Sequence, residues 1–179
     1  MKLNTTDITR IALMTAVLCI LGPISFPLSF SEVPISLGIL GIFLCLVILG
    51  QRNGTICIIL YILIGMIGIP VFAGFSSGVG IVMGPSGGYI AGYIPLGIIA
   101  GFFIDKYSGK PYLQALGMAL GTAVCYLLGT LWLAKTTGLG FGAALLAGVI
   151  PFIPFDAAKL VIALAVGKPI NKALGKISK

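Results

Sequence analysis

The sequence predicts an all-α integral membrane protein with six transmembrane helices, and three observations support this fold class. Hydrophobic residues make up 59% of the 179 positions, charged residues make up 8%, and the mean hydropathy is +1.18. The apolar residues gather in six runs, and a helix needs about 20 such residues to cross a bilayer. The 26 glycines and 10 prolines follow no collagen period, and both residues are frequent in transmembrane helices. We therefore expect residues 1–179 to form one membrane-embedded domain.

The six helices can be placed in order along the chain. The first contains a bend near Gly22-Pro23, and a hydrophilic turn, Gln51-Arg52-Asn53, joins the second to the third. The fourth and fifth are simple apolar runs. Pro151 and Pro154 break the sixth, so a short or re-entrant helix is expected before a longer one. The predicted ranges are 8–28, 35–50, 54–70, 88–104, 112–134, and 141–150 followed by 155–168.

The basic residues predict the orientation in the membrane. Segments on one side of the six helices hold nine of the 11 basic residues, and cytoplasmic segments are enriched in Lys and Arg. Both termini are therefore expected in the cytoplasm, with Glu32, the loop 71–87 and residues 151–159 near the outer face. Topology also explains the net charge of +7, so no nucleic-acid partner is expected. The nine residues are Lys2, Arg10, Arg52, Lys106, Lys110, Lys168, Lys172, Lys176 and Lys179.

Asp156 and Lys159 are two charges in the apolar stretch PFIPFDAAKL, three residues apart on one helix face. A local salt bridge, or a helix cap with Lys159 reaching outward, is one interpretation. Such a pair stabilises a helix by only about 0.2–0.5 kcal/mol when it lies on the helix surface. A charge near the middle of the membrane costs about 2.5–3.5 kcal/mol or more. A contact with a polar ligand is therefore favoured.

A second candidate is the uncharged, glycine-rich segment 70–93, PVFAGFSSGVGIVMGPSGGYIAGY. Glycine lets backbone approach a ligand closely, and irregular backbone at membrane depth is tolerated where it is buried or lines a cavity. An ordinary outer loop with a turn at Gly84-Pro85-Ser86-Gly87 is the alternative. Because the segment is also hydrophobic, we expect it to fold back over the protein as a lid.

The chain offers little for catalysis. It has no histidine, four carboxylates and no GxxxxGK[ST] phosphate loop. The four cysteines lie in apolar runs without metal-ligand spacing, so no metal or cofactor is expected. An enzyme is disfavoured. A transporter of this sequence would take its energy from another chain.

The small residues Ala12 and Ala16 lie four apart in the first helix and would let another helix approach closely, although internal packing is the simpler interpretation. With PVFAGFSSG from Pro70, GPSGGY at 84–89 and PFIPFDAAK at 151–159, they give the chain its resemblance to the BioY family. The members of this family are biotin-binding substrate-binding (S) components of energy-coupling factor (ECF) transporters. The resemblance covers nearly the whole chain. Two positions depart from the usual pattern, with Phe155 in place of Gly and Ser86 in place of Thr.

The resemblance implies a multi-pass protein of a prokaryotic cytoplasmic membrane that captures biotin at its outer face. Its partners would be a transmembrane coupling protein, docked at Ala12 and Ala16, and two ABC-type ATPase subunits. Asp156 would accept from the ureido ring of biotin and Lys159 would pair with its carboxylate. An S component for another vitamin, such as thiamin or riboflavin, and a stand-alone secondary transporter remain the alternatives. The implied substrate-binding residues are Asp156, Lys159, Gly84, Ser86, Gly87, Gly88 and Tyr89.

Overall fold

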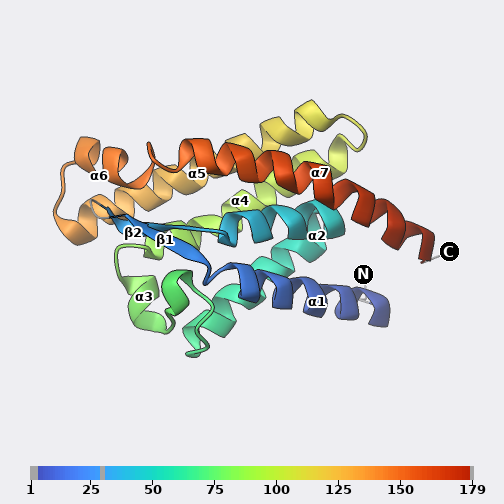
Figure 1. Cartoon of the computed structure of the whole chain (residues 1–179), viewed down its shortest axis with the longest axis horizontal. Helices are drawn as coiled ribbons and strands as arrows, with labels where there is room; N and C mark the ends of the chain where they lie inside the picture. The colour runs from blue at the N-terminus through green and yellow to red at the C-terminus, as the bar shows by residue number, and fades with distance from the viewer. Residues whose placement is uncertain (1–3, 29–30, 178–179) are drawn as a thin grey trace.

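The computed structural model of the chain describes residues 4–28 and 31–177, and its long helices lie side by side with both termini at one end (Figure 1). A short β-hairpin and three short helices lie at or near the other end. The chain is thus mostly helical, as predicted. The long helices are α1 (Thr5–Leu21), α2 (Gly38–Met66), α4 (Gly87–Lys106), α5 (Pro111–Thr137) and α7 (Ile153–Ile177).

Helix α1 begins with a capping box and ends earlier than the sequence suggested. The Asn4 side chain accepts from the helix start, while the Asp7 carboxylate accepts from the Asn4 N–H. The helix stops at Leu21, immediately before Gly22-Pro23, so the predicted extension to residue 28 is wrong. The prolines that follow cannot donate helical hydrogen bonds, and the chain becomes extended instead.

The extended segment forms a hairpin, so the all-α prediction is wrong at this point. Strand β1 (Ser25–Leu28) pairs antiparallel with β2 (Ser31–Ser36), with Ser25 opposite Ser36 and an irregularity in register after Phe26. Val33 and Ile35 alternate with less buried residues along β2 and point into the protein. The hairpin therefore has an apolar inner face that can cover a cavity.

Helix α2 contains the turn that was predicted between the second and third helices. The backbone leaves helical geometry at Gly50 (φ 79°), one residue before the Gln51-Arg52-Asn53 turn, and the chain reverses direction (Figure 1). A Cβ on Gly54 would lie 3.0 Å from the Leu46 Cα. In a straight helix eight residues would span about 12 Å, so this proximity requires a fold-back. The Asp105 carboxylate accepts from the Gln51 N–H at 3.1 Å and caps the returning stretch.

The glycine-rich segment is ordered into two short elements, η1 (Ala73–Phe75) and α3 (Val79–Met83). Several hydrogen bonds attach this segment to the rest of the protein, among them one to α2 and one to α5. The Gly78 N–H donates to the Gly65 carbonyl at 2.7 Å, and the Trp132 indole N–H donates to the Gly84 carbonyl at 2.9 Å. The segment thus folds back onto the protein, as expected for a lid.

Helices α4 and α5 match the predicted fourth and fifth helices to within a few residues. Helix α5 starts with Pro111 at its first turn and ends at Thr137, where Gly138 caps it with a φ of 74° that suits glycine. The sixth helix is divided as predicted, into α6 (Phe141–Gly148) and α7, which meet at an angle of 45°.

Among the described residues, three helices, α2, α4 and α5, are long and apolar enough to cross a membrane, and the number is four if the bent pair α6 and α7 is one span. Helix α4 packs against both α2 and α5, and glycines bring the backbones together. A Cβ on Gly92 of α4 would lie 3.0 Å from the Cys125 Cα of α5. This close packing holds α4 firmly beneath the hairpin.

Candidate binding site

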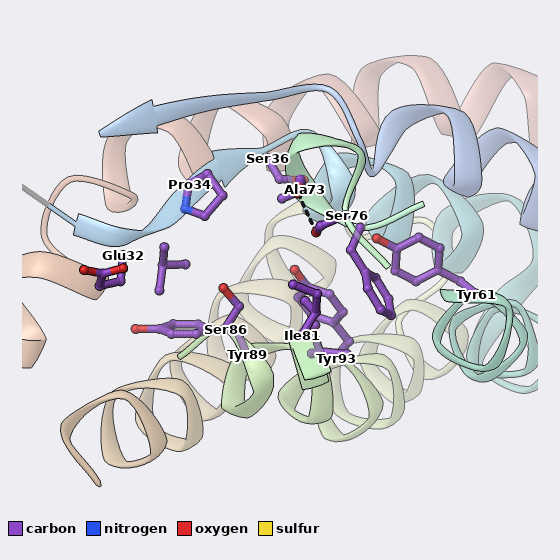
Figure 2. A pocket seen from close by; sticks show the side chains of 13 residues that line it. Glu32, Pro34, Ser36, Tyr61, Ala73, Ser76, Ile81, Ser86, Tyr89 and Tyr93 are labelled. Carbon is purple, nitrogen blue, oxygen red and sulfur yellow. Dashed lines mark hydrogen bonds between the residues drawn. The ribbon is translucent and has the colours of Figure 1, made fainter. Parts of the chain in front are cut away.

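A cavity of about 210 Å³ lies at the hairpin end of the bundle, away from the termini. Figure 2 shows its walls. Glu32, Pro34 and Ser36 come from β2, Tyr89 and Tyr93 come from α4, and Ser86 directly precedes α4. The third wall is the returning half of α2 with the glycine-rich segment, which contributes Tyr61, Phe72 and Ser76. The cavity therefore combines aromatic surface with several hydroxyl groups, the composition typical of a small-molecule site.

A smaller cavity of about 30 Å³ adjoins the first and shares five of its lining residues, Ser36, Tyr89 and Tyr93 among them. Its additional lining residues include Tyr126, Phe152 and Lys159. The two cavities are therefore adjacent, and we call them together the hollow. The Lys159 side chain lines the smaller of the two.

Lys159 and Asp156 form a buried ion pair in the first two turns of α7. The Lys159 Nζ lies 2.6 Å from Asp156 Oδ1, and the two residues are 5% and 4% exposed. The interpretation in which Lys159 reaches outward to water is therefore wrong, whereas the local salt bridge is present. Burial of both charges is favourable only where the remaining polar groups are also satisfied.

Two further hydrogen bonds complete this cluster. Lys159 donates to the Ser36 carbonyl of β2 at 2.7 Å, and the Tyr126 hydroxyl of α5 donates to Asp156 Oδ2 at 2.6 Å. Both carboxylate oxygens are therefore bound, and two of the three ammonium N–H groups are used. One N–H of Lys159 is left for a group in the cavity.

Asp156 faces a different space from Lys159. It lines a recess of about 300 Å³ between α5 and α7, together with Thr122, Ala123 and Tyr126. The carboxylate therefore lies on the side of Lys159 that faces away from the hollow. It fixes the position of the Lys159 ammonium group and compensates its charge.

The predicted residues at 84–89 divide into two groups. The side chains of Ser86 and Tyr89 line the cavity of about 210 Å³, and the Tyr89 hydroxyl donates to the Gly148 carbonyl at 3.0 Å.

The three predicted glycines, Gly84, Gly87 and Gly88, do not line this cavity. Gly84 accepts the indole bond from Trp132, while a Cβ on Gly87 or Gly88 would overlap the Val82 carbonyl or the Trp132 side chain. These glycines act by close packing, which places the start of α4.

Sequence reasoning missed several lining residues, most clearly Tyr93. Ser86, Tyr89 and Tyr93 have the spacing i, i+3, i+7, which puts them on one face of a helix and could have been noticed. Tyr126 and Ser36 carried no such signal, because they lie 30 and 123 residues from their partners in the cluster. Only the fold brings them together.

Ala12 and Ala16 lie on α1, and both are exposed. They do not pack inside the protein, so the interpretation of this spacing as internal packing is wrong. Their face is open to another helix. Within the described part of the chain, no group of three or more His, Cys, Asp or Glu side chains is placed to hold a metal ion.

Comparisons with known proteins agree on one family. A sequence profile described as "BioY family" matches residues 1–176. The "Probable biotin transporter BioY" of Pyrococcus horikoshii is 34% identical, over 92% of this chain and 96% of the relative. The "Biotin transporter BioY2" of Lactococcus lactis is 30% identical, over 97% and 94%. A crystal structure of the S-component for biotin from an ECF-type ABC transporter superposes with a TM-score of 0.87, at 27% identity, over 96% of this chain and 95% of that one.

Proposed function

The chain belongs to the BioY family, as its sequence motifs indicated, and we propose from this that it is a biotin-binding S component of an ECF transporter. The observation that carries the proposal is the hollow between β2, the glycine-rich segment and α4, with Lys159 lining its smaller cavity. The relatives named above are biotin transporters, so another vitamin is not favoured. A stand-alone transporter is likewise not favoured, because the biotin-binding structure that superposes on this chain is the S-component of an ECF-type ABC transporter.

Biotin has an apolar body with a carboxylate at one end and a ureido ring at the other, and the site offers partners for each part. The remaining N–H of Lys159 would donate to the carboxylate, as the sequence suggested. The apolar body would lie against Tyr89 and Phe72. The hydroxyls of Ser86 and Tyr93 have no hydrogen-bond partner within the described chain and would serve the ureido ring. Asp156 lines the recess between α5 and α7 and does not line the hollow, and its oxygens hold Lys159 and Tyr126, so we assign Asp156 the task of positioning Lys159.

We further propose six membrane crossings: α1, the two antiparallel stretches of α2, α4, α5, and the bent pair α6 and α7. An even number agrees with the two termini lying at one end of the bundle (Figure 1). The excess of Lys and Arg at that end favours its placement in the cytoplasm of a prokaryote. The biotin hollow then opens toward the outside, where the substrate arrives.

The single domain would work with a transmembrane coupling protein and two ABC-type ATPases. The family to which the chain belongs consists of transporter components and not of enzymes, so we assign ATP hydrolysis to the partners. Exposed Ala12 and Ala16 would let a helix of the coupling protein approach α1 closely.

A binding cycle tests the role of Lys159. Calorimetry would compare biotin with its neutral amide, on the wild type and on Lys159→Met. Losing a charge-assisted hydrogen bond costs about 1.5–3 kcal/mol of binding free energy, which corresponds to roughly a 10- to 100-fold loss of affinity. We expect that loss either when the ligand carboxylate is removed or when the lysine is removed, with little further loss when both are changed. Additive losses would show that the carboxylate does not meet Lys159.

A further inference from the structure

A second cavity, of about 440 Å³, lies at the opposite end of the bundle from the biotin hollow. It is bounded by the turn in α2, the end of α4, the start of α5, and α7. Polar side chains dominate its lining, which includes Asp105, Ser108, Gln114, Lys168 and Asn171. None of these residues takes part in the proposed biotin site, so this cavity needs a separate explanation.

Gln114 supplies the first sign of a ligand. Its side chain is 6% exposed, and its Nε2 donates to the Ile104 carbonyl at 3.2 Å. Its Oε1 is buried and, within the described part of the chain, accepts no hydrogen bond. Buried side-chain acceptors are normally satisfied, so this oxygen is open to a donor such as a water molecule or a bound ligand.

Asp105 supplies a second acceptor at the same cavity. Its Oδ2 accepts from the Gln51 N–H at 3.1 Å, while its Oδ1 lies beside Gly50 and accepts no hydrogen bond from the described residues. Lys168 lines the cavity as a half-buried cation, and residues 4–28 and 31–177 provide it with no ion-pair partner. Asn171 differs from both, because its amide already donates to the Val47 and Ile48 carbonyls.

The complementary ligand carries both an N–H-bearing cation and an anion. A simple anion would be repelled by Asp105, and a simple cation would be repelled by Lys168 and by the other basic residues at this end of the protein. We infer that the cavity binds a phosphoethanolamine headgroup. The ammonium would donate to Asp105 Oδ1 and Gln114 Oε1, and the phosphate would meet Lys168.

A membrane lipid is the source to which we assign this headgroup. In the proposed membrane topology, on which this assignment rests, the cavity lies at the end of the bundle that carries the termini, where the membrane-spanning helices end and lipid headgroups are concentrated. Phosphatidylcholine has the same phosphate but a quaternary ammonium without N–H donors. The site should therefore distinguish phosphatidylethanolamine from phosphatidylcholine.

The test is titration of the purified protein in detergent with dioctanoyl phosphatidylethanolamine and dioctanoyl phosphatidylcholine, followed by native mass spectrometry. We expect the wild type to bind the ethanolamine lipid at least tenfold more tightly. Asp105→Asn keeps an oxygen for the Gln51 N–H but presents a donor to the cavity, so the preference should fall to within twofold. Lys168→Met should weaken both lipids, whereas Lys172→Met, one turn away and outside the lining, should change neither.

Equal affinity of the wild type for the two lipids would overturn the proposal, as would a preference that survives Asp105→Asn. Free glycerophosphoethanolamine tests the source, and binding as tight as that of the lipid would refute the lipid assignment. Helical content by circular dichroism identifies any variant that fails to fold. A variant that keeps biotin binding at the other end is folded by a second criterion.

Discussion

The buried cluster of Asp156, Lys159 and Tyr126 makes a strong prediction about stability. Asp156→Ala leaves the Lys159 ammonium, 5% exposed, with only the Ser36 carbonyl as partner. Breaking a buried ion pair on one side costs about 3–5 kcal/mol. The Tyr126 hydroxyl also loses its acceptor, so we expect a loss toward the upper end of that range. Reversible chemical unfolding in mixed micelles, followed by circular dichroism, measures this free energy.

The double variant Asp156→Leu with Lys159→Met removes both charges and keeps apolar side chains in their place. Its free energy of unfolding therefore shows whether Asp156→Ala is unstable because a charge is unpaired or because packing is lost. Replacing a whole buried pair by apolar residues of similar size is often neutral or stabilising. We therefore expect the double variant to recover most of the stability lost by Asp156→Ala, although it should no longer bind biotin well. Tyr126→Phe, which removes one charge-assisted hydrogen bond to the buried carboxylate, should cost about 1.5–3 kcal/mol. A double variant as unstable as Asp156→Ala would refute the charge-based explanation.

Three further predictions concern backbone contacts and docking. Gly88→Ala places a Cβ against the Trp132 side chain and should cost about 1–3 kcal/mol by overpacking, whereas Gly80→Ala, with nothing within 4 Å, should be neutral in the same unfolding assay. Gly50→Ala forces a residue with a Cβ to φ 79° and against Asp105, so it should lower the thermal midpoint of unfolding; an unchanged midpoint would contradict the described turn. Ala12→Trp lies on an exposed face, so it should leave biotin affinity unchanged while reducing co-purification with the coupling protein; retained assembly would remove α1 as the docking surface.

Most of the long helices were predictable, because apolar runs and chain breakers act locally. Pro111 and Gly138 bound α5, and Pro151 marks the bend between α6 and α7. The hairpin was not predicted. Its strands are short. The residues of β1 also lie in the apolar run that starts in α1, so the sequence alone did not show that the helix ends before Gly22-Pro23.

The site was predictable only in part, for a similar reason. The spacing of Asp156 and Lys159 placed both charges on one face of a helix, and the structure shows them in contact. The partners that orient them, Ser36 and Tyr126, come from β2 and α5. The sequence also could not reveal that Gly87 and Gly88 serve packing, because that depends on Val82 and Trp132 lying against them.

Calorimetric titration of the purified wild-type protein with biotin, with thiamin and riboflavin in parallel, tests whether this chain is a biotin-binding S component. A hollow lined by Lys159, Tyr89 and Tyr93 predicts one tightly bound biotin per chain and no comparable binding of the other two vitamins. If a folded protein binds no biotin, or binds thiamin or riboflavin more tightly, the assignment as a biotin-binding S component is contradicted.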